Sequence, residues 1–261
     1  MNYQYIQYHL DARAVVWITL NRAATHNALN PEMMQELVDA FSRAGQDTSV
    51  RAIVLGGVGE SFCAGGDLKW MESNLDKPRQ QRIAESNLLG ELFRAVNSCA
   101  KLVVGRINGP AYGGGVGLIS VCDIAIGIET AMFALSEVKL GLIPANIAPY
   151  VIQKMGLAKV RRTALNAIRF DASEALALGL LDKVVANDAL DAAIEFELKL
   201  ALAAAPGAIA ETKKRLLQLH SGEMQDPARE LVEALADVWE GDEAQAGIRA
   251  FFAKNSPPWK L

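Results

Sequence analysis

The sequence predicts an α/β fold, because short apolar runs typical of buried strands alternate with amphipathic runs typical of helices along its first two thirds. The 261 residues are 51% hydrophobic and 21% charged, which suits one substantial core and is unlike a disordered or fibrous chain. Beyond residue 173 the pattern is almost entirely helical. We therefore expect an α/β core followed by a helical C-terminal region.

The predicted strands are short, apolar and rich in β-branched residues. They cover residues 14–20, 52–55, 102–107 and 124–128. A helix is predicted over residues 31–46, because Asn30 can cap it and Pro31 suits its first position. A second helix is predicted over about residues 80–99, after a break at Lys77 and Pro78. This spacing alone does not separate a spiral of stacked small sheets from a doubly wound sheet.

The later helices are predicted from their start and stop signals. Asp171 and Glu174 form a capping pair, and Gly179 ends the helix that they begin. Pro206 and Gly207 break the next helical run. The remaining helices are expected near residues 189–204, 209–220, 227–239 and 242–254.

Composition excludes several classes of protein. The net charge of −4 gives no broad basic surface for nucleic acid or anionic lipid. The first ten residues lack a signal-peptide pattern, and no window reaches about 18 uninterrupted apolar residues. Cys63, Cys99 and Cys122 have no C-x-x-C spacing and lie in or beside apolar segments, so we expect buried reduced thiols and a cytoplasmic location. The histidines have no metal-binding spacing, and neither a metal nor a redox cofactor is expected.

Two glycine-bearing loops are the most informative stretches. They read F-C-A-G-G-D-L at residues 62–68 and N-G-P-A-Y-G-G-G-V-G at residues 108–117, and each follows a predicted strand and precedes a predicted helix. Backbone N–H groups at helix starts have no partner within the helix and favour negative charge. Two such corners can together form an oxyanion hole. Taken alone, the three consecutive glycines could equally be a tight turn.

These loops occur in a series that resembles the crotonase (enoyl-CoA hydratase/isomerase) superfamily. They are followed by C-D-I-A-I at residues 122–126 and F-A-L-S-E-V-K-L-G-L-I-P at residues 133–144, and residues 251–254 resemble the closing helix of that family. The resemblance implies a ββα spiral core that binds acyl-CoA over residues 1–195. It also implies a helical trimerisation region over residues 196–261, in a homotrimer or a dimer of trimers. Coenzyme A would be part of the substrate, with no permanently bound cofactor.

The resemblance also assigns roles to residues. Gly66 and Gly114 would supply the two oxyanion amides, and Glu137 would be the catalytic acid/base. Burial in an apolar run would raise the pKa of Glu137 toward a useful range, whereas the alternative is a plain surface glutamate. Asp123 is expected to be structural. The expected substrate- or CoA-binding residues are Ala64, Gly65, Asp67, Leu68, Lys69, Gly113, Gly117, Asn146 and Lys254, with Lys69 and Lys254 as phosphate partners and Arg22 as a weaker candidate.

Gly117 departs from the family pattern. Two-glutamate hydratases of the family carry their other glutamate at this position, and here it has no side chain. We hypothesise that the space left at Gly117 admits a carboxylate of the substrate or an ordered water, so that Glu137 moves both protons. This variant resembles a bacterial branch acting on 3-methylglutaconyl-CoA and isohexenylglutaconyl-CoA, in leucine and acyclic-terpene breakdown.

The expected function is therefore hydration of a branched or carboxylated 2-enoyl-CoA, or the reverse dehydration. The alternative is a single-glutamate Δ3,Δ2-enoyl-CoA isomerase. A third possibility is RNA binding, which one relative of the methylglutaconyl-CoA hydratases performs through a lysine-rich helix. Here the corresponding helix, residues 80–99, mixes Arg82 and Arg94 with Glu85 and Glu91, so its charge argues against RNA.

Overall fold

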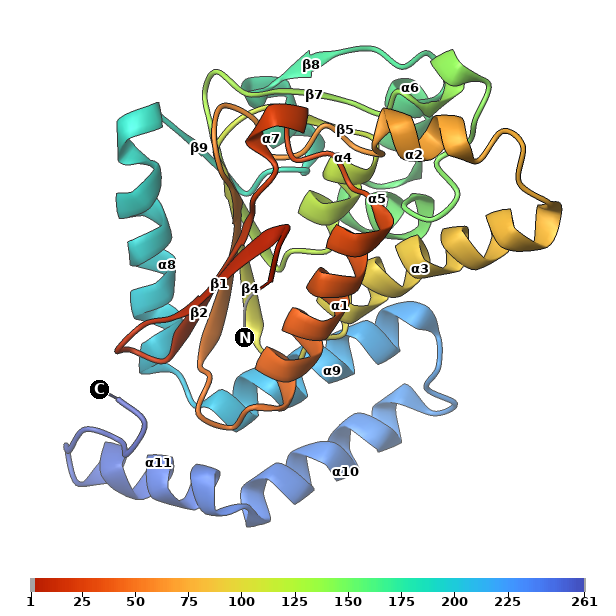
Figure 1. Cartoon of the computed structure of the whole chain (residues 1–261). Helices are drawn as coiled ribbons and strands as arrows, with labels where there is room; N and C mark the ends of the chain where they lie inside the picture. Colours follow the sequence, from red (N-terminus) through yellow and green to blue (C-terminus); the bar gives the residue numbers. More distant parts are fainter. Residues whose placement is uncertain (1–2, 261) are drawn as a thin grey trace.

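The computed structural model describes residues 3–260, which form two β-sheets with helices on both faces of the larger one (Figure 1). The order of the larger sheet is β1 (Ile6–Leu10), β2 (Val15–Leu20), β3 (Ala52–Gly57), β4 (Leu102–Ile107), β6 (Ile124–Ile128) and β9 (Lys183–Val185). Strand β1 is antiparallel to β2, and the other neighbours are parallel. The smaller sheet contains β5 (Ala111–Tyr112), β7 (Met132–Ala134) and β8 (Phe170–Asp171). These sheets and helices confirm the predicted α/β class.

Helices make up most of the remaining chain. They are α1 (Pro31–Gln46), α2 (Leu68–Ser73), α3 (Arg79–Asn97), α4 (Gly114–Ser120), α5 (Ala148–Met155), α6 (Leu157–Ala164), α7 (Ala172–Leu178), α8 (Leu190–Ala203), α9 (Pro206–Ser221), α10 (Pro227–Glu240) and α11 (Asp242–Phe252). Single 3-10 turns occur at η1 (Ala23–Thr25), η2 (Glu137–Leu140) and η3 (Asn187–Ala189).

The core lies between the larger sheet and the helices on its two faces. Helix α1 contacts α3, β1 and β2, whereas α8 packs on β3, β4 and β6 from the opposite face (Figure 1). The sequence dictates the position of α1, because the Asn30 side chain accepts a hydrogen bond from the Met33 N–H at 3.1 Å and an apolar stripe ending at Phe41 is buried. Each such large apolar side chain contributes about 1.5–3 kcal/mol by its burial.

The predicted strands do not include β1. Ile6, Tyr8 and Leu10 alternate with polar residues, which is the pattern of a strand, but only Ile6 is buried in this edge strand. The strand is held by backbone pairing with β2 and by the Glu36 carboxylate, which accepts a hydrogen bond from the Tyr5 N–H at 2.8 Å. The Glu36 contact leaves no local signal, whereas the alternation of Ile6, Tyr8 and Leu10 with polar residues does.

The C-terminal helices begin and end close to their predicted positions. Helix α8 spans Leu190–Ala203, so it crosses the expected domain boundary between residues 195 and 196 while packing on the sheet. Pro206 occupies the first position of α9 instead of lying in the linker before it. Helices α10 and α11 form a layer beyond α9 with little buried surface, exposing apolar side chains that include Val232, Leu235, Trp239, Phe251 and Phe252 (Figure 1).

Among the helices of residues 3–260, none combines the length and the apolar character needed to cross a bilayer.

The two glycine-bearing loops lie together where the parallel strands β3 and β4 end. A backbone bridge joins Cys63 to Ala111, and the Tyr112 N–H donates to the Cys63 carbonyl at 3.0 Å. A third segment joins them, because the Leu29 N–H donates to the Gly65 carbonyl at 2.7 Å and the Asp67 N–H to the Leu29 carbonyl at 2.9 Å. The corner is therefore built from three loops connected by backbone hydrogen bonds.

The close approach of these loops requires glycine at residue 115. A Cβ at Gly115 would lie 2.2 Å from the Cys63 carbonyl oxygen. We expect Gly115→Ala to lower the free energy of unfolding by about 2 kcal/mol, because overpacking against backbone outweighs the helix propensity of alanine. Chemical denaturation measures this loss. Gly56→Ala is the control, since the nearest atom to its Cβ is 3.5 Å away. Equal stability of the two variants would contradict the close packing of the loops.

Candidate active site

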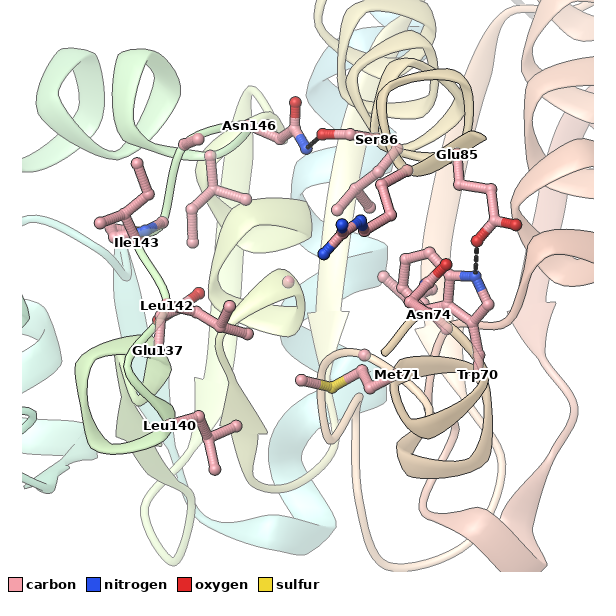
Figure 2. A pocket seen from close by; sticks show the side chains of 18 of the residues that line it. Trp70, Met71, Asn74, Glu85, Ser86, Glu137, Leu140, Leu142, Ile143 and Asn146 are labelled. Carbon is pink, nitrogen blue, oxygen red and sulfur yellow. Dashed lines mark hydrogen bonds between the residues drawn. The ribbon is translucent and has the colours of Figure 1, made fainter. Parts of the chain in front are cut away.

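A cavity of about 680 Å³ opens beside this corner (Figure 2). It is bounded by α2 and α3 on one side and by the segment from Glu137 to Ile147 on the other. Most of its lining is apolar: Leu29, Leu68, Trp70, Met71, Leu75, Leu89, Leu140, Leu142, Ile143, Pro144, Ala145 and Ile147. The side chains with polar groups are few: Glu72, Asn74, Arg82, Glu85, Ser86, Glu137 and Asn146. Such a pocket suits an apolar ligand that carries a few polar groups.

Gly66 and Gly114 both line the cavity, as the sequence predicted for the oxyanion pair. Within residues 3–260, neither backbone N–H donates a hydrogen bond. Gly114 is the first residue of α4, where an N–H has no partner in the helix. The Gly65 Cα lies 3.8 Å from where a Cβ on Gly114 would be, so the two loops are in contact. Two free donors therefore face one cavity from adjacent loops.

Glu137 places its carboxylate in the same cavity, as the first residue of η2. Its Oε1 lies 3.0 Å from where a Cβ on Gly113 would be, and Gly113 has a φ of 48°, so residue 113 must be glycine. The other oxygen, Oε2, is buried and has no hydrogen-bond partner in the described chain. Burial raises the pKa of Glu137 above the ordinary glutamate value, and a hydrogen bond from its own backbone N–H offsets this only in part. The site thus holds a poorly solvated carboxylate beside the loop that carries Gly114.

The space expected at Gly117 does not exist, so that prediction is wrong. A Cβ at Gly117 would lie 2.4 Å from Ile147 Cγ2 and 2.9 Å from two ring carbons of Phe93. Gly117 is buried within α4 and does not line the cavity. A sequence cannot reveal this, because Phe93 and Ile147 reach the position from other elements. Ile147 and Phe93 thus fill the space directly beside Gly117.

Asp67 holds the loop that carries Gly66. Its carboxylate caps α2 by accepting hydrogen bonds from the Lys69 and Trp70 N–H groups at 2.9 and 3.2 Å. The same carboxylate forms an ion pair with Arg22 at 2.8 Å, and Asp67 is not among the residues that line the cavity. The Arg22 partner and the two cap bonds lower the pKa of Asp67 against the opposing effect of burial. Asp67 and Arg22 therefore stabilise the loop that carries Gly66 without lining the cavity.

The remaining predicted binding residues lie at different distances from the cavity. Leu68 and Asn146 line the cavity, and Gly65, with a φ of 91°, lies directly behind it. Ala64 and the exposed Lys69 lie near the corner but outside the lining. Lys254 follows α11, which lies at the opposite end of the molecule from α2 (Figure 1). One chain thus does not bring Lys254 to its own cavity.

A cluster around Glu85 joins α2 to α3, and the sequence motifs did not indicate it. The Glu85 carboxylate accepts a hydrogen bond from Trp70 Nε1 (Figure 2) and also forms an ion pair with Lys77. The Lys77 ammonium and the Trp70 indole lower the pKa of Glu85. Arg82, Glu85, Ser86 and Leu89 recur at helical spacing, so a polar face of α3 was the available signal. This cluster forms the outer wall of the cavity.

Several other groups are structural. Asp123 accepts hydrogen bonds from the Val103 N–H at 2.8 Å and from Lys213 at 2.7 Å, which confirms its predicted structural role. The three cysteines are buried free thiols, and burial raises the pKa values of Cys63 and Cys122 to about 12. No cluster of three or more His, Cys, Asp or Glu side chains between residues 3 and 260 is arranged to hold a metal ion.

The chain is similar to known proteins along most of its length. Residues 11–261 match the family model described as enoyl-CoA hydratase/isomerase. Enoyl-CoA hydratase ACTT6 of Alternaria alternata is 34% identical, over 94% of this chain and 81% of that protein. The mitochondrial delta(3,5)-delta(2,4)-dienoyl-CoA isomerase of Homo sapiens is 31% identical, over 83% of this chain and 69% of that protein. The crystal structure of an enoyl-CoA hydratase from Shewanella pealeana has a TM-score of 0.94 at 36% identity, covering 98% of this chain and 96% of that one, and this likeness confirms the crotonase-like core.

We expect Glu137→Gln to stabilise the protein at neutral pH. A raised carboxyl pKa means that the folded state holds the proton more tightly than the unfolded state, so wild-type stability falls as pH rises from the ordinary value of 4.5 through the raised one. Glutamine removes this loss. Thermal denaturation should show a higher Tm for the variant at pH 7 and no such gain at pH 4. Glu72→Gln, an exposed change on the same cavity, is the control. A variant without any gain at pH 7 would contradict the desolvation of Glu137.

We expect Gly117→Glu to lower the free energy of unfolding by about 3 kcal/mol, because it forces a side chain into Ile147 and Phe93. Gly117→Ala should already destabilise the fold, and adding Ile147→Ala should recover part of that loss by removing the nearest contact. Denaturation curves of the three variants give the comparison. If Gly117→Glu had the same free energy of unfolding as the wild type, the space beside residue 117 would have to be open.

Proposed function

The chain belongs to the enoyl-CoA hydratase/isomerase family of enzymes, and from this premise we propose that it adds water to the 2,3-double bond of an enoyl-CoA. One observation carries the proposal: the Glu137 carboxylate, whose buried Oε2 has no hydrogen-bond partner within residues 3–260, lines the same cavity as Gly66 and Gly114, whose N–H groups donate to no acceptor in that range. This pairing supplies what hydration needs, namely a proton carrier and a site for negative charge on the thioester oxygen.

The amides act when charge develops. Addition at C3 of the acyl group moves electrons through C2 to the thioester oxygen, which becomes an enolate held between the Gly66 and Gly114 N–H groups. These donors are fixed by the hydrogen-bonded loops, so they need little reorganisation as the charge appears. Removal of one such donor typically costs about 3 kcal/mol of transition-state stabilisation.

Glu137 moves the proton in both halves of the reaction. Its carboxylate takes a proton from water while the oxygen of that water bonds to C3. The resulting carboxylic acid then returns the proton to C2 as the enolate collapses, so that the product is a 3-hydroxyacyl-CoA and Glu137 is again ionised. The raised pKa of Glu137 favours this exchange, because a carboxyl group with a weakly acidic proton is also a better base. The same steps in reverse dehydrate the product.

The proposed acyl group is branched or carboxylated, such as that of 3-methylglutaconyl-CoA or isohexenylglutaconyl-CoA. The apolar lining supports a branched chain, since Leu140, Leu142 and Ile143 expose aliphatic side chains beside the cavity (Figure 2). Covering these side chains with ligand would remove apolar surface from water, a gain of roughly 25 cal/mol per Å². Such substrates arise in leucine and acyclic-terpene breakdown.

An isomerase is the second candidate, and the closed position at Gly117 favours it. With Phe93 and Ile147 covering that position, Glu137 is the carboxylate left beside the two amides. One carboxylate suffices to move a proton between C2 and C4 of an enoyl-CoA, and the human relative is named as an isomerase of dienoyl-CoA.

We also propose that the protein works as a homotrimer or a dimer of trimers. The apolar side chains exposed on α10 and α11, which include Trp239, Phe251 and Phe252, support this assembly. A second copy would also be needed to bring Lys254 to a bound acyl-CoA, because α11 lies far from α2 within one chain (Figure 1).

A panel of 2-enoyl- and 3-enoyl-CoA thioesters separates the two reactions. Hydration consumes the conjugated 2-enoyl thioester and its ultraviolet absorbance, whereas isomerisation creates that absorbance from a 3-enoyl substrate. We expect the first outcome, with incorporation of solvent oxygen at C3. We expect Glu137→Gln to lower kcat by about 10²–10⁴-fold. Creation of the conjugated thioester without uptake of solvent oxygen would replace hydratase by isomerase.

The pH dependence provides a further check on Glu137. Hydration starts from the ionised carboxylate, so activity should fall on the acid side of a kcat/KM profile. Because burial raises the pKa of Glu137, the midpoint of this fall should lie above 4.5. An acid limb at or below the ordinary glutamate value would argue that Glu137 is fully solvated.

A further inference from the structure

Arg82 brings a free positive charge to the cavity. Its side chain is part of the lining on α3, and within residues 3–260 it forms neither an ion pair nor a hydrogen bond. The neighbouring cation Lys77 is already paired with Glu85. An exposed guanidinium is well hydrated while the cavity is open, but a bound ligand would displace that water. The cavity thus favours a ligand that brings its own negative charge to Arg82.

Ser86 places a hydroxyl one turn along the same face of α3. Its Oγ accepts a hydrogen bond from Asn146 Nδ2 at 2.9 Å (Figure 2). The Ser86 hydroxyl donates to no other group in the described part of the chain, so its proton is available to a ligand. Gly90, a further turn along, makes room for Asn146, since a Cβ there would lie 3.3 Å from Asn146 Oδ1. Asn146 therefore orients a second donor beside Arg82.

These donors lie toward the acyl part of the cavity. Asn146 belongs to the same segment as Glu137, and Figure 2 shows Asn146 and Ser86 along one side of the cavity with Ile143, Leu142 and Glu137 along the next. Under the proposed function, a thioester oxygen held at Gly66 and Gly114 would place C2 and C3 near Glu137. The end of the acyl group would then extend along the apolar wall toward Asn146 and Ser86.

We propose that Arg82 and Ser86 bind a carboxylate at the distal end of the acyl group, and that Asn146 is a positioning residue that orients Ser86. The proposal rests on the proposed function for the placement of the acyl chain, and it makes a dicarboxylic acyl-CoA the preferred substrate class. The planar guanidinium suits a carboxylate, because its N–H groups match both oxygens. Glu85 does not oppose this anion strongly, because Lys77 balances its charge.

Binding of unreactive thioesters tests the proposal independently of the reaction. Glutaryl-CoA and pentanoyl-CoA have the same number of acyl carbons, and only the first carries a distal carboxylate. We expect Arg82→Met to weaken the binding of glutaryl-CoA by about 10- to 100-fold, as measured by calorimetry, and that of pentanoyl-CoA by less than about 3-fold. Arg82→Lys should recover part of the loss. Arg79→Met, on the same helix but outside the lining, is the matched control.

The Asn146 role has its own readout. Asn146→Ala and Ser86→Ala should each reduce the preference for glutaryl-CoA over pentanoyl-CoA by about 3- to 10-fold, without a matching loss for pentanoyl-CoA. If these substitutions only disturbed the packing of the cavity wall, the affinities for glutaryl-CoA and pentanoyl-CoA would fall by the same factor.

Other outcomes overturn the proposal. Equal weakening of both thioesters and of free coenzyme A by Arg82→Met would assign Arg82 to a CoA phosphate. Unchanged binding of both would leave Arg82 in solvent. Hydration of a neutral enoyl-CoA by a wild type that shows no preference for glutaryl-CoA would reject this inference while leaving the proposed function intact. Conversely, a preference for glutaryl-CoA without any hydration would support the carboxylate site and reject the proposed hydration.

Discussion

The backbone hydrogen bonds between the two glycine-bearing loops are the constraint on which the rest of the site depends. Tyr112 and Cys63 join the loops, and Leu29 fixes the Gly65 end from a third segment. These bonds use the neighbouring amides, so the N–H groups of Gly66 and Gly114 are held in place, and among residues 3–260 they have no acceptor. In water such groups would be solvated and mobile. Here the scaffold has already met the cost of orienting them, which is the condition for strong electrostatic stabilisation of an oxyanion.

In the proposed reaction, the carboxylate beside these amides serves function at the expense of stability. The buried Glu137 Oε2 has no partner in the part of the chain that the structure describes, and an unpaired buried polar atom destabilises a fold by about 1–3 kcal/mol. A hydrogen-bonded or ion-paired glutamate would be more stable there but a weaker base. The contrast with Asp67 is instructive, since Arg22 and two backbone N–H groups hold that carboxylate in its ionised form for a structural task. Two acidic residues near one corner thus differ in chemistry because of their partners.

Local signals predicted most of the fold and the centre of the site. Helix α1 follows from its cap and its apolar stripe, and Gly66, Gly114 and Glu137 lie together as their motifs implied. The alternation of apolar and polar residues in strand β1 was overlooked, whereas the other errors depend on contacts between distant segments. Strand β1 is held by Glu36 from another element, and the absence of a side chain at Gly117 says nothing about what fills the space. The polar face of α3 was visible as a pattern, but its meaning required knowing that the helix borders a cavity.

The Glu85 cluster has a consequence for how such an enzyme can change. The reactive corner is built from loops at the ends of β3 and β4, whereas the outer wall of the cavity consists of α2 and α3, joined through Trp70, Glu85 and Lys77. Substitutions at the lining residues of α3 can alter the width and charge of the cavity, whereas those on α2 also affect Gly66, because Met71 Sδ lies 3.3 Å from where a Cβ on Gly66 would be. Under the proposed function, α3 can therefore change selectivity while the glycine-bearing corner stays the same, so that relatives with one common corner can diverge in the acyl groups that they accept.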